Sequence, residues 1–166
     1  KFENKLCRVF NDSFENYQTN NKYDMIYAAT SFHWIDPQTA YCKAKKLLND
    51  NGFLVTFWNR ILTKDEYILN HINHDYINSD IIRIIKNKID EIKKVPYFDL
   101  LFYKIYSMDM EIDYIQYINY LETHPVYLEL DRTEKKKIIN MLEQNYKEKL
   151  IDVRIVSDLY IQKVSK

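Results

Sequence analysis

The sequence predicts an α/β domain built on a mostly parallel β-sheet, and three segments carry that prediction. Residues 24–30 are apolar without alternation, which is typical of a strand buried on both faces. Residues 37–48 repeat apolar positions at helical spacing, and residues 53–58 are again apolar and strand-like. A strand, a helix and a strand in this order predict a βαβ unit with parallel strands and a right-handed crossover.

The segments around this unit extend the prediction. Residues 6–10 are expected to form a short strand that lies parallel and adjacent to the other two, followed by a polar loop over residues 11–22. Asp36 is expected to cap the first helix, with Pro37 at its first position. Residues 49–52 should then form a turn in which Gly52 takes a positive φ.

The second half of the chain reads as a helical insert followed by a return to the sheet. One helix should begin at the capping box of residues 63–66 and another at Ser79, with an isoleucine stripe over residues 81–92 that forms core or a lid. Residues 98–106 should rejoin the sheet, residues 112–121 and 131–146 should be helical, and residues 152–164 should form a long final strand. No linker or repeat interrupts the chain, so residues 1–166 are expected to form a single domain.

Composition narrows the classes of function. Lys plus Arg and Asp plus Glu both number 24, so the net charge is zero, and we expect no nucleic-acid partner. No apolar run is long enough to predict a membrane span. The two cysteines, Cys7 and Cys42, suit a reducing compartment, and we expect a cytoplasmic protein. The single glycine, Gly52, excludes a Gly-rich phosphate or nucleotide loop within this chain.

Candidate site residues follow the expected strands. In open parallel sheets, ligands bind beyond the carboxyl ends of the strands. The polar and aromatic residues at these ends are Asn11, Asp12, Ser13 and Phe14 after the first strand, Thr30, Ser31, Phe32, His33 and Trp34 after the second, and Trp58, Asn59 and Arg60 after the third. We therefore expect Asp12, Thr30, His33 and Asn59 to cluster on one edge of the sheet.

Two quoted segments make the prediction more specific. YDMIYAATSFHWIDP (residues 23–37) and AYCKAKKLLNDNGFLVTFWN (residues 40–59) resemble the central part of Rossmann-like S-adenosylmethionine-dependent methyltransferases, in the branch that methylates small molecules. That family has an apolar strand with small residues, often an aromatic or His-Trp pair, and a helix that ends in an LLxxxG turn. Residues 12–14 are similar to its acidic motif after the third strand. The resemblance covers nearly the whole chain, and after residue 60 it rests on layout.

The resemblance has one large departure. The family's first strand with its Gly-rich loop, and the acidic residue that ends its second strand, have no counterpart here. The chain therefore resembles a C-terminal portion of such an enzyme, with the N-terminal strands of the sheet missing. By this resemblance, the 166-residue chain alone is expected to be inactive and to bind S-adenosylmethionine only weakly.

The resemblance also implies roles for the candidate residues. Asp12 would accept a hydrogen bond from the adenine amine, with Ser13 and Phe14 beside the ring, and Thr30 and Ser31 would lie near the sulfonium. Trp34, Asn59 and Arg60 would contact the small-molecule acceptor. His33 would act as a catalytic base for a hydroxyl or amine acceptor, whereas Arg60 or Arg132 would orient a carboxylate.

Plainer interpretations remain open beside these. His33 could be a hydrogen-bonded residue at a strand end, Trp34 a packing residue and Asp12 a turn residue. His71 and His74 are three apart, but no third ligand is apparent, and we expect no metal site. The alternative function is a non-catalytic α/β module that retains the methyltransferase scaffold and binds a partner through a strand edge or the helical insert.

Overall fold

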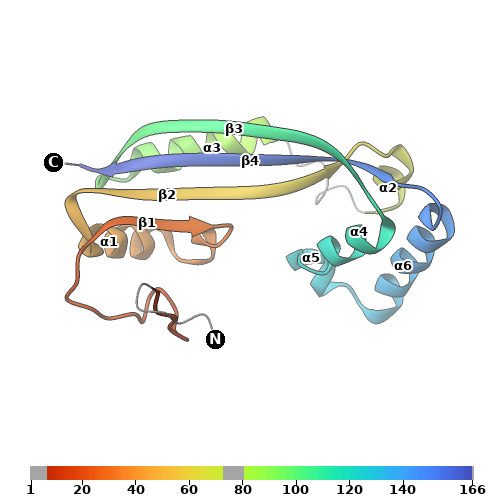
Figure 1. Ribbon diagram of the computed structural model, residues 1–166, viewed down its shortest axis with the longest axis horizontal. Helices are drawn as coiled ribbons and strands as arrows, with labels where there is room; N and C mark the ends of the chain where they lie inside the picture. The colour runs from red at the N-terminus through yellow and green to blue at the C-terminus, as the bar shows by residue number, and fades with distance from the viewer. Residues whose placement is uncertain (1–6, 73–80, 166) are drawn as a thin grey trace. The chain divides into compact units, whose positions relative to one another are not determined.

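The computed structural model describes residues 7–72 and 81–165, and it confirms the α/β class (Figure 1). In chain order the elements are β1 (Tyr23–Ala29), the 3₁₀ helix η1 (Phe32–Trp34), α1 (Pro37–Leu47), β2 (Leu48–Thr63), α2 (Glu66–His71), α3 (Ile81–Lys94), β3 (Phe98–Ile112), α4 (Tyr114–Leu121), α5 (Pro125–Glu129), α6 (Arg132–Tyr146) and β4 (Ile151–Val164). No described helix is long and apolar enough to cross a membrane.

The four strands form one mixed sheet in the order β1-β2-β4-β3. β1 and β2 are parallel, with Ala29 opposite Phe57, which confirms the predicted pairing of residues 24–30 with residues 53–58. β4 runs antiparallel to β2. The Ser157 hydroxyl donates to Asn59 in β2, whereas the carbonyl oxygen of Asp152, earlier in β4, accepts from the amide of Lys64, just after the end of β2. The final long strand therefore reverses direction relative to the βαβ unit.

The contacts divide the chain into two compact units. Unit 1 comprises Lys1–Phe57, Asp90–Tyr103 and Leu159–Lys166, and unit 2 comprises Trp58–Ile89 and Lys104–Asp158. The core of unit 1 includes Tyr41, whose ring lies 6.0 Å from that of Phe98. Unit 2 has its own core, built from Ile68, Ile72, Ile112, Tyr117, Leu121, Tyr127, Leu142, Tyr146, Ile151 and Val153.

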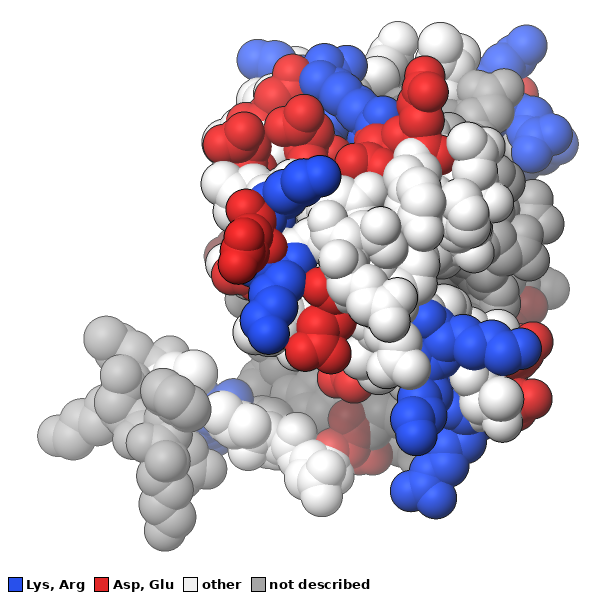
Figure 2. All heavy atoms as spheres, turned by 90° about the vertical axis from the view of Figure 1, so that its right-hand side faces the viewer, with Lys and Arg blue, Asp and Glu red and all other residues white. Residues whose placement is uncertain are grey.

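The face that carries α2 and α6 is mixed in charge. Figure 2 shows acidic and basic side chains around an area of uncharged residues on this face. Opposite charges interspersed in this way leave no extended field of one sign there.

The strand expected at residues 6–10 is not formed where the structure describes it. Cys7 makes an isolated bridge and residues 8–10 have no regular structure, while Val9 and Phe10 are 61% and 59% exposed. The prediction of a third strand parallel and adjacent to β1 and β2 is therefore wrong. Strand-forming residues need a partner edge for their backbone groups, and no described strand pairs with residues 8–10.

The structure gives Gly52 a different role from the one expected from the sequence. It lies within β2 and does not have a positive φ. The register passes from Tyr23 opposite Leu48 to Met25 opposite Phe53, so β2 bulges outward between these pairs. A Cβ on Gly52 would lie 3.0 Å from the carbonyl oxygen of Asn49, a tight contact, so the close approach of the backbone favours glycine here.

Several boundaries differ from the sequence prediction. Asp65, rather than Thr63, caps α2, since its side chain accepts from the amides of Tyr67 and Ile68. The predicted cap at Ser79 lies outside the described residues. Ile85 and Ile92 of the isoleucine stripe are buried, whereas Ile82 is 80% exposed.

Candidate functional site

The candidate adenine-binding segment is an exposed, internally bonded turn. Oδ1 of Asp12 accepts from the amide of Ser13 at 2.9 Å. The Ser13 hydroxyl accepts from the amide of Asn16 at 3.2 Å, and its carbonyl accepts from the amide of Tyr17 at 3.0 Å. These bonds give the carboxylate of Asp12 a defined position at the surface.

Helix α1 holds this turn in place through one lysine. Lys43 Nζ donates to the carbonyl oxygen of Glu15 at 2.6 Å and lies 5.7 Å from the ring centroid of Phe14. The hydroxyls of Tyr17 and Tyr23 are 2.7 Å apart, which ties the turn to the start of β1. The sequence did not predict this contact of Lys43, because nothing local indicates which loop a long side chain reaches.

Thr30 stands at the carboxyl end of β1 in a rare backbone conformation. Its φ is 50°, in the left-handed region that β-branched residues seldom adopt. Its amide donates to the carbonyl oxygen of Phe57 at 2.8 Å, so the β1–β2 pairing extends to the turn. The chain leaves the sheet at this residue and continues into Ser31 and η1.

The His-Trp pair lies on η1 and faces outward. Phe32 is buried, 6% exposed, with its ring 5.1 Å from that of Tyr41, and it anchors the segment. The rings of His33 and Trp34 lie 4.8 Å apart, and Trp34 is 66% exposed. Trp34 is therefore not part of the packed core, and unit 1 carries an imidazole and an indole side by side beyond a parallel strand.

Asp36 caps α1 as predicted, and the cap gives the helix a pH dependence. Its side chain accepts from the amide and the hydroxyl of Thr39, and these bonds hold its pKa below the ordinary value. Because the folded-state pKa is lowered, this stabilisation is present above the unfolded-state pKa and is lost as pH falls through the folded-state pKa.

We expect Asp36→Ala to lower the melting temperature at neutral pH by an amount that shrinks as the solution is acidified. Thermal melts followed by circular dichroism between neutral and acidic pH measure this difference. Thr39→Val is the control, since it removes the hydroxyl but keeps the amide bond, which is the larger cause of the shift. A difference that does not vary with pH would contradict the assignment.

Asn59 and Arg60 do not end a strand, contrary to the sequence expectation, because β2 continues to Thr63. Both belong to unit 2, and the expectation that Asn59 shares an edge with the residues of unit 1 stays a prediction. Asn59 Oδ1 accepts from the Ser157 hydroxyl at 2.6 Å, and Arg60 forms an ion pair with Asp158.

Asp158 is the residue that sequence reasoning missed. Its side chain is only 1% exposed, and Arg60 is its ion-pair partner among the described residues. The alternation of residues along β4 could have indicated this, because Asp158 shares its face of the strand with Val156 and Tyr160, which are both buried. A carboxylate at an inward position indicates a buried partner of opposite charge.

Of the two histidines considered as metal ligands, His71 is the one that the structure describes. Nδ1 of His71 lies 2.7 Å from the carbonyl oxygen of Tyr67, and the two rings stack at 4.1 Å. His74 lies outside the described residues. Within residues 7–72 and 81–165, no group of three or more His, Cys, Asp or Glu side chains could hold a metal ion.

No protein-family model matches the chain, and no curated protein matches it. Several solved structures, however, match the chain. A methyltransferase candidate from Bacillus halodurans is 11% identical, and the match covers 92% of this chain and 69% of that one with a TM-score of 0.49. A type II methyltransferase candidate from Anaeromyxobacter dehalogenans is 12% identical, with 86% and 64% covered and a TM-score of 0.49.

A third solved structure is the O-methyltransferase of a trans-AT PKS multienzyme from Brevibacillus brevis, in complex with S-adenosyl-L-homocysteine. It is 15% identical, with 95% of this chain and 49% of that one covered and a TM-score of 0.37. The chain thus spans between 49% and 69% of the length of these three proteins.

Proposed function

We propose that this chain is part of an S-adenosylmethionine-dependent methyltransferase that acts on a small-molecule acceptor. The observation that carries the proposal is Thr30, with its φ of 50° at the carboxyl end of a parallel strand, followed at once by the outward-facing His33 and Trp34. Ligands bind at such strand ends, and strained backbone concentrates at functional sites. Two free cysteines, Cys7 and Cys42, are compatible with a cytoplasmic location.

The residues of unit 1 fit one part of the cofactor. The exposed carboxylate of Asp12 is chemically suited to accept the adenine amine, with Ser13 beside it and the ring of Phe14 as an apolar neighbour. The hydroxyls of Thr30 and Ser31 are suited to the sulfonium end. S-adenosylmethionine supplies an activated methyl group when bound. The single glycine lies in the β2 bulge, so this chain offers no Gly-rich cradle for the methionine moiety.

The chain's own side chains would then position and desolvate the acceptor. His33 would take a proton from a hydroxyl or amine, and Trp34 would exclude water from its approach. Asn59 and Arg60 remain proposed substrate contacts from the sequence. The ion pair with Asp158 already occupies the guanidinium of Arg60, which leaves Arg132, exposed at the start of α6, as a second cation for a carboxylate acceptor.

A test of this site uses chemical-shift mapping by NMR, with adenosine and S-adenosylhomocysteine as probes at millimolar concentration. We expect shifts in residues 12–14 and 30–33. Asp12→Ala should weaken adenosine binding by about tenfold, because a hydrogen bond to a charged group is lost. Asp50→Ala, an exposed aspartate in the β2 bulge of the same unit, is the matched control and should bind as the wild type does.

Shifts confined to other residues, or equal affinity in Asp12→Ala and Asp50→Ala, would overturn the adenine assignment. Micromolar binding of S-adenosylmethionine to this chain would overturn the expectation that the Gly-rich contacts are needed.

One observation favours the alternative of a non-catalytic binding module. β3 is an edge strand, and its side chains from Leu101 to Glu111 are all exposed, among them Phe102, Tyr106 and Met108. An exposed apolar edge is a template for pairing with another chain. Concentration-dependent association abolished by Tyr106→Lys, with no adenosine response at residues 12–14, would favour this module over the enzyme.

A further inference from the structure

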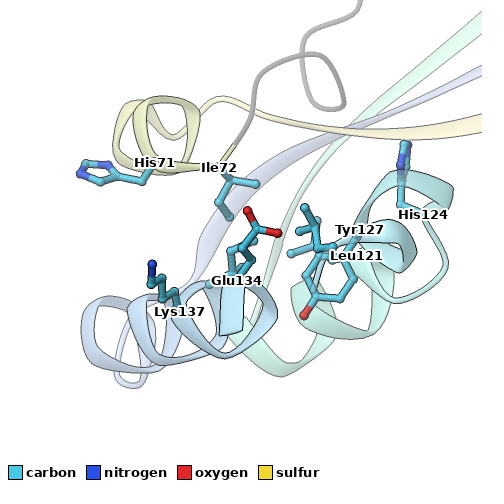
Figure 3. Close-up of a pocket in the computed structure, with 9 residues that line it drawn as sticks. His71, Ile72, Leu121, His124, Tyr127, Glu134 and Lys137 are labelled. Atoms are coloured by element: carbon cyan, nitrogen blue, oxygen red, sulfur yellow. The ribbon is translucent and has the colours of Figure 1, made fainter. Parts of the chain in front are cut away.

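Unit 2 contains a pocket of about 310 Å³, and its lining includes none of the residues predicted from the sequence to form the methyltransferase site. It is enclosed by the end of α2, by α4 and α5, and by the first two turns of α6 (Figure 3). Its lining residues are His71, Ile72, Leu121, His124, Tyr127, Leu130, Glu134, Lys137 and Ile138. All of them belong to unit 2, so the pocket is complete within one compact part of the chain.

The inner wall of the pocket is apolar. Ile72, Leu121 and Tyr127 are 4%, 3% and 5% exposed, and all three belong to the packed core of the unit. Leu130 and Ile138 are half-buried and continue this wall. A wall fixed by core residues is largely preformed, as small-molecule pockets usually are.

Two side chains of opposite charge lie at the opening of the pocket. Glu134 and Lys137 are both exposed and lie three residues apart on α6, which places them on neighbouring turns of one face. In Figure 3 the carboxylate of Glu134 is turned toward Ile72 above the apolar wall. One of its oxygens accepts from the amide of Asp131, which fixes the side chain as part of a capping box.

Glu134 and Lys137 do not pair with each other. No ion pair joins Glu134 to Lys137 among the contacts of the described residues, and the ammonium of Lys137 has no hydrogen-bond partner there. The half-buried histidine His124 adds little charge to the pocket. Burial lowers the pKa of His124, which is therefore neutral at pH 7, and His71 points away from the pocket in Figure 3.

An apolar wall with one anion and one cation at its mouth is complementary to a zwitterion with an apolar body. We propose that this pocket binds a hydrophobic α-amino acid or a close derivative of one. Glu134 would receive the ammonium group, Lys137 the carboxylate, and the apolar wall the side chain. This inference does not depend on the proposed methyl transfer, because every residue that it uses belongs to the pocket.

The test compares three ligands of one shape on the 166-residue chain, with affinity measured by NMR titration. L-phenylalanine has both charges, phenethylamine lacks the carboxylate, and 3-phenylpropionate lacks the ammonium. We expect L-phenylalanine to bind about three- to fivefold more tightly than either analogue, since a charge pair at a solvent-exposed mouth is worth up to about 1 kcal/mol.

The variants separate the two contacts. Lys137→Gln should remove the preference for L-phenylalanine over phenethylamine while keeping the preference over 3-phenylpropionate, and Glu134→Gln should do the reverse. Glutamine at position 134 can keep the capping box, so the helix start is preserved. Lys136→Gln and Glu143→Gln, two exposed charges on α6 outside the pocket lining, are the matched controls and should leave all three affinities unchanged.

Three results would overturn the proposal. They are equal binding of all three ligands to the wild-type chain, no binding of any of them, and chemical-shift changes outside the residues that line the pocket. Failure of the adenosine experiment would not affect these outcomes, because its responding residues lie in unit 1.

Discussion

Replacing Arg60 with methionine is expected to lower the free energy of unfolding by about 3–5 kcal/mol, the largest effect that we predict for a single substitution. The carboxylate of Asp158 is 1% exposed and pairs with the 21% exposed side chain of Arg60. Its second oxygen, Oδ2, has no hydrogen-bond partner among the described residues. Methionine fills similar space but leaves a buried charge without a partner, and that charge is costly in an apolar surrounding. Urea-induced unfolding of the two proteins measures the difference.

The control for this prediction is the double substitution Arg60→Met with Asp158→Leu. Removing both charges leaves an apolar pair of similar volume, and its stability should return close to that of the wild type. If Arg60→Met alone costs less than about 1 kcal/mol, the usual range for an exposed pair, the buried ion pair is wrong. Arg60 would then be available to orient a carboxylate acceptor, so the experiment also decides between the two roles of this residue.

Asp65→Ala is expected to lower the free energy of unfolding by about 3 kcal/mol, because one carboxylate oxygen serves two purposes. Oδ1 caps α2 by accepting from the amides of Tyr67 and Ile68, and it also accepts from the buried hydroxyl of Tyr146 at 2.6 Å. Loss of the carboxylate frays the helix and leaves a buried hydroxyl unpaired. The free energy of unfolding in urea and the helical signal in circular dichroism should both fall.

Tyr146→Phe separates the two contributions of Asp65. It removes only the hydroxyl, keeps the helix cap, and should cost about 1–2 kcal/mol. Equal losses in Tyr146→Phe and Asp65→Ala would mean that the cap contributes nothing. Because α2 ends at His71 and Ile72 follows it in the pocket wall, Asp65→Ala should also weaken binding of L-phenylalanine, whereas Tyr146→Phe should weaken it less.

Local sequence determined the βαβ unit and the start of its helix. Each of three features can be recognised from a few neighbouring residues: the apolar run of β1, the Asp36-Pro37 pair, and the spacing of Ala40 and Ala44. Capping and helical periodicity depend on neighbours in the chain, so they can be recognised without the fold. For the same reason Thr30, His33 and Trp34 were expected beyond the end of a parallel strand, and they lie there.

Contacts between residues far apart in the sequence determined the features that local sequence did not predict. Residues 6–10 have strand-forming composition, but a strand exists only where another edge completes its hydrogen bonds, and composition does not contain that information. Gly52 is fixed by the carbonyl of Asn49 in a bulge whose register depends on β1. Arg60 is engaged by Asp158, 98 residues away in sequence, and Lys43 reaches a loop 28 residues before it. A long charged side chain takes its role from the group that it meets, so only the tertiary structure could assign these residues.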